Sequence, residues 1–197
     1  SFCQDKIMST GGEGGMVTTN DKLLWEKMWS YKDHGKSYSA VHEKKHAPGF
    51  RWVHESFGTN FRMTEMQSAI GRIQLRKLKE WSRIRRNNAK KLKEVCDKFK
   101  NFLFTPTCTD GSIHAYYKFY TYLNLSALKE GWTREKIINE LQKKGIPSFS
   151  GSCSEIYLES AFKNTPFKPK ERLPIAKKLG ETSLVFLVHP TLSADDM

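Results

Sequence analysis

The stretch Ser1-Phe2-Cys3-Gln4-Asp5-Lys6-Ile7-Met8-Ser9-Thr10-Gly11-Gly12-Glu13-Gly14-Gly15-Met16-Val17 decides which fold this chain is expected to have. Its glycines do not form the dinucleotide-binding pattern GxGxxG, because Val17 stands where the third glycine is required. They also lack the GK[ST] ending of a phosphate-binding P-loop. By themselves, these glycines indicate only a tight, left-handed connection between two elements.

Lys6 precedes the glycines by a few residues and gives them a second interpretation. The backbone of a glycine-rich turn can approach a bound group closely. A lysine held against such a turn therefore suits Schiff-base chemistry with a phosphate-bearing aldehyde, provided that its amine is neutral. The Ser1 hydroxyl is a candidate donor to that phosphate. The residues alone leave the choice open, since most lysines beside glycines are exposed and have no such role.

Downstream of the glycines, the pattern predicts a strand at Met16–Thr19 and then a helix at Lys22–Tyr31. Asn20 or Asp21 can cap this helix, and Gly35 suits its left-handed C-terminal end. No sustained period follows between residues 36 and 60. We expect a functional or interface loop there, because loops of this length are uncommon in compact domains.

A capping box opens the clearest helix of the chain. Thr64-Glu65-Met66-Gln67 pairs a threonine at the cap with a glutamine three residues later. Apolar residues then recur at helical spacing as far as Phe99, which predicts one long helix or two placed end to end. The helix is lined with basic residues, namely Arg72, Arg76, Lys77, Arg83, Arg85, Arg86, Lys90, Lys91 and Lys93.

A break in composition at Thr105–Ser112 marks an internal boundary. Beyond it the pattern predicts a small α+β lobe. The expected strands are 116–125, 146–150 and 184–188, and the expected helices are 133–144 and 173–179.

Composition sets further limits. Lys and Arg total 33 and Asp and Glu total 21 in 197 residues, so the formal net charge is +12. The longest apolar run, Leu184–Val188, is too short to span a membrane.

Four widely spaced cysteines without a CxxC pair exclude a disulfide scaffold or a zinc ribbon, and we expect no metal and a reduced, cytoplasmic protein. The chain starts at Ser1 and stops on Asp-Asp-Met, so we expect a fragment of a longer protein.

Several motifs together resemble those of the DegT/StrS-type sugar aminotransferases, which depend on pyridoxal 5'-phosphate (PLP). Ser1–Asp21 matches their Ser-Phe, three variable residues, Schiff-base lysine, Gly-Glu-Gly-Gly and a strand ending in Thr-Asn-Asp. Gly58–Gly71 is similar to their Gly-Tyr-Asn-Phe-Arg-Met-Thr-Glu run, and Leu75–Ala89 continues that match. Asp33-His34-Gly35 and Val188–Ser193 resemble two further family segments.

The resemblance implies an α/β fold of the aspartate-aminotransferase-like, PLP-dependent transferase type. Residues 1–100 would form the C-terminal part of an incomplete large domain. Residues 101–197 would form a small α+β domain that lacks its last helix. Since family members are nearly twice as long, the chain is expected to be the C-terminal half and to be inactive alone.

The resemblance also implies roles for individual residues. Lys6 would bind PLP as a Schiff base and move protons, and Ser1 would hydrogen-bond the phosphate. Asn60 and Arg62 would reach toward the phosphate in a neighbouring subunit's site, although packing and an ion pair at the helix start would also explain them. His34 and Arg51 are candidate substrate-binding residues, and a structural role for His34 stays open.

In this family the substrate is a nucleotide-linked keto-sugar, which receives an amino group, usually from glutamate, for amino-sugar and surface polysaccharide biosynthesis. The resemblance implies a homodimer with shared sites. Two departures from the family pattern concern specificity: Cys3 stands where histidine is common, and residues 145–153 replace a Tyr/Pro/His-rich substrate segment.

Two alternatives remain at this point. A sugar dehydratase of the same fold would carry histidine in place of Lys6. A non-enzymatic module that binds nucleic acid or another polyanion would use the basic helix face, but acidic Glu80 and Glu94 interrupt that face and no recognised nucleic-acid motif accompanies it.

Overall fold

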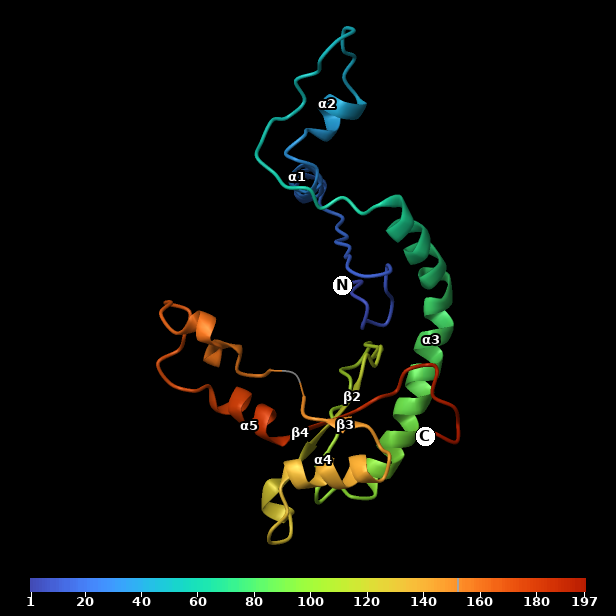
Figure 1. Ribbon diagram of the computed structural model, residues 1–197, viewed down its shortest axis with the longest axis vertical. Coiled ribbons are helices and arrows are strands. Elements are labelled where there is room, and N and C mark those ends of the chain that lie inside the picture. The colour runs from blue at the N-terminus through green and yellow to red at the C-terminus, as the bar shows by residue number, and fades with distance from the viewer. Residues whose placement is uncertain (152) are drawn as a thin grey trace. The chain divides into compact units, whose positions relative to one another are not determined.

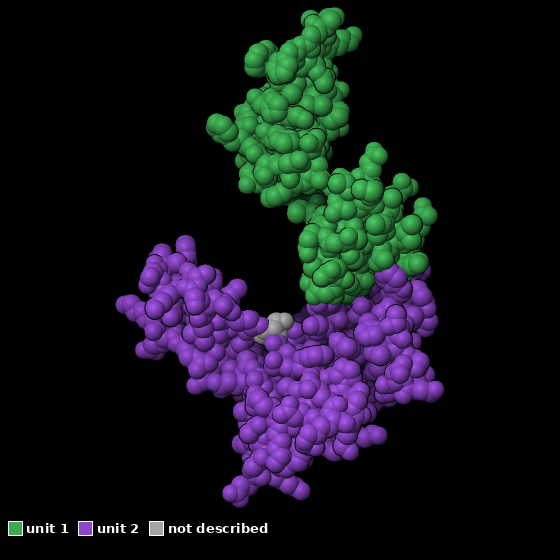
Figure 2. All heavy atoms as spheres, in the orientation of Figure 1, with its two compact units in different colours: residues 1–78 green, residues 79–197 purple. Residues whose placement is uncertain are grey.

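The computed structural model describes residues 1–151 and 153–197, which divide into two compact units (Figures 1 and 2). The first unit comprises Ser1–Leu78 and the second Lys79–Met197. Helix α3 (Glu65–Asp97) contributes residues to both. The expected domain boundary after residue 100 stays a prediction.

The first unit contains two short helices whose starts are capped by side chains. Asp21 accepts a hydrogen bond from the Leu24 amide at 3.0 Å and opens α1 (Lys22–Lys32), which confirms the predicted helix. Ser37 accepts from the Ala40 amide at 3.3 Å and opens α2 (Tyr38–His42), a helix inside the segment expected to be a loop. The Trp29 and Tyr38 rings, 5.1 Å apart, pack α2 beside α1.

The strand expected at Met16–Thr19 is wrong. These residues are irregular, and both Met16 and Val17 are exposed. A strand needs a neighbouring strand to pair its backbone groups, and no strand lies in the described part of this unit. Val17 and the threonines favour β structure, but without a partner strand they do not form a strand.

Helix α3 is one continuous helix of 33 residues, and its predicted capping box is present. The Thr64 amide donates to Gln67 Oε1 at 3.1 Å, and the Gln67 amide donates to Thr64 Oγ1 at 3.3 Å. Some of its basic side chains are paired along the helix itself, as in Arg83–Glu80 at 2.6 Å and Lys93–Asp97 at 2.7 Å.

The second unit is built on a four-stranded antiparallel sheet in the order β1-β2-β4-β3. The strands are β1 (Leu103–Phe104), β2 (Phe119–Leu123), β3 (Ser148–Phe149) and β4 (Ser183–Phe186). Phe119 pairs with Phe186, and Ser148 pairs with Phe186 from the other side. The strands predicted around β2, β3 and β4 are confirmed in shortened form, whereas β1 was not expected.

Two helices pack against this sheet, α4 (Arg134–Lys143) beside β3 and α5 (Pro174–Thr182) beside β2. Both lie within or next to the predicted helical segments. The described residues of this unit also include the short 3-10 turns Leu125–Ala127, Ile156–Leu158 and Ser160–Phe162. Together these elements form the predicted small α+β lobe.

The core of the second unit lies between α3 and the sheet. Ala89 and Cys96 from α3 pack with Phe119 of β2 and with Val188, all buried. Arg85, also buried, donates from Nη1 to the carbonyls of Tyr116 and Tyr117 at 3.2 and 3.1 Å. These bonds tie α3 to the segment that leads into β2.

Candidate functional site

The segment that carries Lys6 is a closed loop. The Phe2 amide donates to the Gly14 carbonyl at 2.7 Å, and the Thr10 amide donates to the Phe2 carbonyl at 3.1 Å. A parallel bridge between Cys3 and Gly12 adds a further link across the loop. The two ends of residues 2–14 are thereby held together, and Lys6 lies on the turn between them.

Two of the glycines are required by this geometry. Gly11 has a φ of +79°, a conformation that other residues rarely adopt. Gly14 has no room for a side chain, because a Cβ there would overlap the hydroxyl of Thr10 and lie 3.2 Å from Met63 Cε. The sequence-based interpretation of the glycines as a tight left-handed connection is confirmed.

Lys6 projects from this loop with its side chain 37% exposed and its Nζ 2.9 Å from Asp5 Oδ1. Ser1 Oγ accepts from the Cys3 amide at 3.4 Å, and Ser1 is exposed. The Cys3 thiol donates to Glu13 Oε1 at 3.1 Å. The Asp5 backbone lowers the pKa of Cys3, but hydrogen bonds to the Glu13 and Asp5 carboxylates outweigh it, so that the net pKa is raised.

Arg62, Asn60 and His34 lie together, as three of the predicted site residues. Arg62 Nε donates to Asn60 Oδ1 at 3.1 Å, and Arg62 Nη2 lies 3.2 Å from His34 Nε2. A guanidinium can only donate, so His34 Nε2 must accept and the ring carries its proton on Nδ1. The buried carboxylate of Asp33 lies 3.5 Å from both Arg62 Nε and Lys36 Nζ.

The turn after α1 makes this cluster possible. His34 and Gly35 have φ values of 63° and 85°, so the chain reverses sharply at these two residues. The His34 amide then donates to the Thr59 carbonyl at 3.1 Å, and Asp33 bridges antiparallel to Asn60. Sequence reasoning placed Gly35 at the helix end, and the pairing with residues 59–60 fixes Arg62 beside His34.

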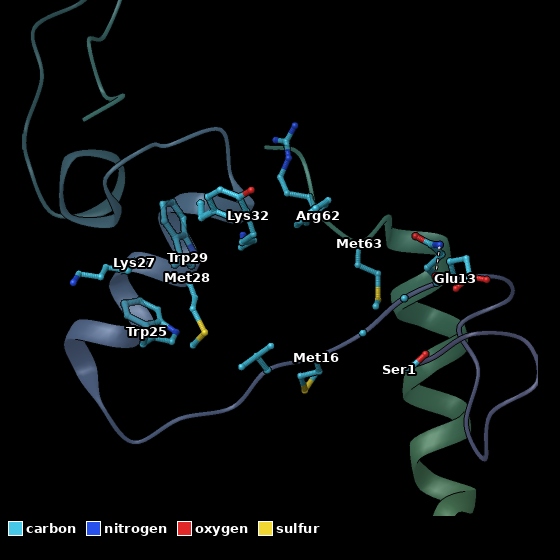
Figure 3. A pocket seen from close by; sticks show the side chains of 16 residues that line it. Ser1, Glu13, Met16, Trp25, Lys27, Met28, Trp29, Lys32, Arg62 and Met63 are labelled. Carbon is cyan, nitrogen blue, oxygen red and sulfur yellow. Dashed lines mark hydrogen bonds between the residues drawn. The ribbon is translucent and has the colours of Figure 1, made fainter. Parts of the chain in front are cut away.

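A cavity of about 920 Å³ lies in the first unit, with Ser1 and Arg62 both on its wall. Figure 3 shows the loop with Ser1 and Glu13 against the start of α3, and Trp25 and Met28 projecting from α1 on the other side. Much of the wall is apolar, formed by Met16, Trp25, Met28, Trp29, Phe61 and Met63. Gly14 and Gly15 expose backbone to it.

Lys6 and Arg51 are not among the described residues that line this cavity. Arg51 is exposed in the segment between α2 and α3, and its sequence neighbours Phe50 and Trp52 are exposed as well. The structure therefore groups Ser1 with Arg62, and Arg62 with Asn60 and His34, but places Arg51 apart from them.

Sequence reasoning missed the residues that hold the site together. The sequence motifs contain Asp33 and predict Gln67 as a cap, but they do not predict the site contacts of either residue. Thr10, 1% exposed, donates from Oγ1 to the Glu13 carbonyl at 3.0 Å and fills the centre of the loop. A polar residue between two turns carries no sequence signal that would predict such burial.

In the second unit, a carboxylate is held by two partners. Arg172 donates to both oxygens of Glu155, at 2.9 and 2.5 Å, and the Tyr157 hydroxyl donates to Glu155 Oε1 at 2.7 Å. These hydrogen bonds, Arg172 first, lower the pKa of Glu155 to about 2. Residues 145–153 lie close by in sequence, and Ser152 among them falls outside the described residues.

Residues 1–151 and 153–197 contain neither a candidate metal cluster nor a candidate membrane-spanning helix. No cluster there brings together three or more His, Cys, Asp or Glu side chains as a metal would require. No helix within those ranges combines the length and the apolar composition that a bilayer crossing requires.

Among solved structures, the chain is similar to an aminotransferase from Psychrobacter cryohalolentis, with 57% identity and a TM-score of 0.95 over 99% of this chain and 51% of that one. Among curated proteins, it is 30% identical to an uncharacterized protein of Methanocaldococcus jannaschii over 100% of this chain and 50% of that protein. It is 29% identical to the GDP-perosamine synthase of Escherichia coli O157:H7 over 100% of this chain and 48% of that enzyme.

The chain thus spans about half the length of the curated relatives it matches. The likeness confirms the predicted fold class, a partial α/β fold of the PLP-dependent transferases. The family model described as the DegT/DnrJ/EryC1/StrS aminotransferase family matches residues 1–197. The chain belongs to this family.

Proposed function

We propose that this chain is the lysine-bearing part of a PLP-dependent aminotransferase that acts on a nucleotide-linked keto-sugar. The observation that carries the proposal is the closed loop of residues 2–14, which presents Lys6 within a chain matched along its whole length by a sugar aminotransferase family. The E. coli relative, a GDP-perosamine synthase, supports a sugar nucleotide as the substrate class.

The residues of this chain fit the cofactor. PLP needs an amine for covalent attachment and donors for its phosphate. The chain offers Lys6 for the first and the Ser1 hydroxyl for the second, and the permanently charged Arg62 is a candidate donor to a neighbouring subunit's phosphate. A Cβ built on Gly15 would meet nothing within 4 Å, so the backbone there is open to a close approach.

When bound, PLP supplies an electron sink that stabilises negative charge on the carbon next to the substrate nitrogen. Lys6 would attach the cofactor through Nζ, and the same amine, once released, would hold and move the proton of that carbon. Ser1 donates to the phosphate, and Arg62 is available to a phosphate with its orientation fixed by Asn60 and His34.

The remaining partners belong to the same proposal. Glutamate is the proposed amino donor, and a homodimer with shared sites would bring Asn60 and Arg62 to a neighbouring subunit's phosphate. All four cysteines are free thiols, which suits a reducing compartment such as the cytoplasm. Residues 1–100 and 101–197 are proposed to belong to the large and the small domain of the complete enzyme.

The structure gives less support to a polyanion-binding module. Arg83, Lys90 and Lys93 on α3 each have an acidic partner on the same helix, at 2.6, 3.9 and 2.7 Å. A face with paired charges has fewer cations to exchange for the counterions of a nucleic acid. Lysine at position 6, rather than histidine, disfavours the dehydratase alternative.

The test is to trap the cofactor on Lys6. PLP is added to the chain, and to a form extended at its N-terminus to the length of the relatives, followed by borohydride reduction, digestion and mass spectrometry. We expect the pyridoxyl mass on the Lys6 peptide of the extended form, and its loss in Lys6→Arg. Lys22→Arg, which changes an exposed lysine paired with Glu26, is the matched control and should keep the label. No selective label on Lys6 in the extended form would refute the proposal, and steep salt-dependent binding to polyanions would then favour the basic module.

A further inference from the structure

Gln67 makes hydrogen bonds in two directions. Its Oε1 accepts from the Thr64 amide and from Thr64 Oγ1, each at 3.1 Å, within the capping box of α3. Its Nε2 donates to the Glu13 carbonyl at 2.9 Å, across a separation of 54 positions in the sequence. This bond is the dashed line beside Glu13 in Figure 3. One side chain therefore joins the start of α3 to the glycine loop.

Glu13 is held by hydrogen bonds both at its backbone carbonyl and at its side-chain carboxylate. Its carbonyl accepts from the buried Thr10 hydroxyl at 3.0 Å as well as from Gln67, and its carboxylate accepts from the Cys3 thiol at 3.1 Å. The Cys3 carbonyl accepts from the Lys6 amide at 3.1 Å. A continuous series of hydrogen bonds thus runs from Gln67 through Glu13 and Cys3 to the backbone of Lys6.

The other direction leads to the Arg62 cluster. Thr64 follows Arg62 by two residues, and the Arg62 amide donates to Asn60 Oδ1 at 3.3 Å. The capping box fixes the residue at which α3 starts. It thereby fixes the point at which the turn of Asn60 and Arg62 joins the helix. Gln67 is connected to both of the segments that carry proposed cofactor-binding residues of this unit.

We infer that Gln67 is a positioning residue, whose side-chain amide holds the Lys6 loop in place against the start of α3. Its relevance to catalysis rests on the proposed function, but the tether is a property of the loop itself. A simple helix cap would need only the acceptor, because glutamate serves equally well at this position of a capping box. The donor, Nε2, is what links the cap to Glu13.

The substitution Gln67→Glu distinguishes the role of Gln67 as a helix cap from its role in holding the loop. It keeps an oxygen for the Thr64 amide, and it replaces the donor to Glu13 with an acceptor that faces a carbonyl. Gln74→Glu is the matched control on the same helix. Gln74 Oε1 accepts from the Ser9 amide of the same loop at 3.5 Å, and a glutamate retains that acceptor.

The experiment is hydrogen exchange of the backbone amides in the full chain and in its N-terminally extended form, without added cofactor. In Gln67→Glu, the Phe2 and Thr10 amides should exchange about five- to tenfold faster, the effect of losing one neutral hydrogen bond. The amides of α3 should be unchanged. In Gln74→Glu, the exchange rates of the loop amides and of the α3 amides should both match those of the unsubstituted protein.

A second readout is the visible absorbance of PLP added to the extended form. Gln67→Glu should require about five- to tenfold more PLP for half-saturation than Gln74→Glu. Unchanged loop exchange in Gln67→Glu would overturn the inference, and so would faster exchange spread equally over the first turns of α3, since Gln67 would then act only as a cap. Absence of a Lys6 label in the unsubstituted protein would instead remove the proposed function and leave the exchange result standing.

Discussion

Two adjacent glycines of the Lys6 loop provide a sharp test of the packing that closes it. A Cβ on Gly14 would overlap Thr10 Oγ1 and lie 3.2 Å from Met63 Cε, whereas a Cβ on Gly15 would meet nothing within 4 Å. Neither residue has a positive φ. The substitutions Gly14→Ala and Gly15→Ala therefore add the same methyl group, without left-handed strain, to an obstructed position and to an open one.

Thr10 cannot move aside cheaply. It is 1% exposed, and its γ-methyl group would lie 3.0 Å from a Cβ built on Gly71 of α3, so the helix closes the space on that side. Inserting a methyl group into a filled site costs about 1–3 kcal/mol, and losing the Thr10 hydrogen bond to Glu13 adds about 1 kcal/mol. We expect Gly14→Ala to destabilise the closed loop by about 2–4 kcal/mol. Gly15→Ala should change its stability by less than about 1 kcal/mol in either direction.

Hydrogen exchange at the Phe2 and Thr10 amides measures this difference directly, because both amides donate to carbonyls within the loop. Exchange should be faster by about 30- to 1000-fold in Gly14→Ala and by no more than about fivefold in Gly15→Ala. Equal protection of these amides in the two variants would refute the argument that Thr10 fills the loop. Borohydride trapping of PLP on the extended form should show the same order, with Lys6 labelled far less in Gly14→Ala.

Three further predictions concern other parts of the chain. Phe119→Ala should lower the free energy of unfolding of the second unit by about 3–5 kcal/mol in urea, because the Phe119 ring is fully buried. Glu155→Gln should lower the thermal unfolding temperature at pH 7, and the difference should shrink as the pH falls from about 5 toward 2. The reason is that the pKa of Glu155 is depressed from 4.5 to about 2, so its stabilisation is present above the unfolded-state pKa and is lost as the pH falls through the folded-state value. Arg62→Lys should raise the half-saturating PLP concentration about tenfold in an absorbance titration, because lysine does not reproduce the fork that contacts Asn60 and His34.

Each of these three predictions has a control variant and a result that would contradict it. Phe167→Ala removes an exposed ring and should leave unfolding nearly unchanged, and an equal loss in both variants would contradict the placement of the core. A stability difference for Glu155→Gln that persists undiminished at pH 2 would show that the Arg172 contact acts through packing. Lys36→Arg keeps the positive charge beside Asp33 and should not alter PLP titration, whereas an equal shift in both variants would contradict a specific role for the Arg62 fork.

The helices could be predicted because their start signals are local. Asp21 and Thr64 each bond an amide three residues away, so cap and helix appear in one short window of sequence. Ser37 carries the same kind of signal and caps α2, but the segment around it has no helical period from which a helix could be predicted. The glycines of the Lys6 loop were interpreted correctly for the same reason, since their role is set by the backbone next to them.

The strands were harder to predict, because a strand depends on a partner elsewhere in the chain. Met16–Thr19 has the composition of a strand and lacks a neighbour in the described part of its unit, so it stays irregular. Leu103–Phe104, with no pattern of its own at only two residues, becomes a strand because β2 lies beside it. Pairing outweighs local preference in both cases.

The site residues depend on partners in the same way, and this limits what motifs can predict. Lys6, Asn60 and Arg62 could be named from sequence patterns, but the contact between Arg62 and His34 joins positions 28 apart. The Gln67–Glu13 bond joins positions 54 apart. A motif identifies the residue that performs the chemistry. The orientation of that residue is fixed by other polar side chains, and the sequence alone does not show which partner each of these side chains has in the folded chain. Conservative changes at Gln67 or Asp33 should therefore impair cofactor binding even though Lys6, Asn60 and Arg62 are intact.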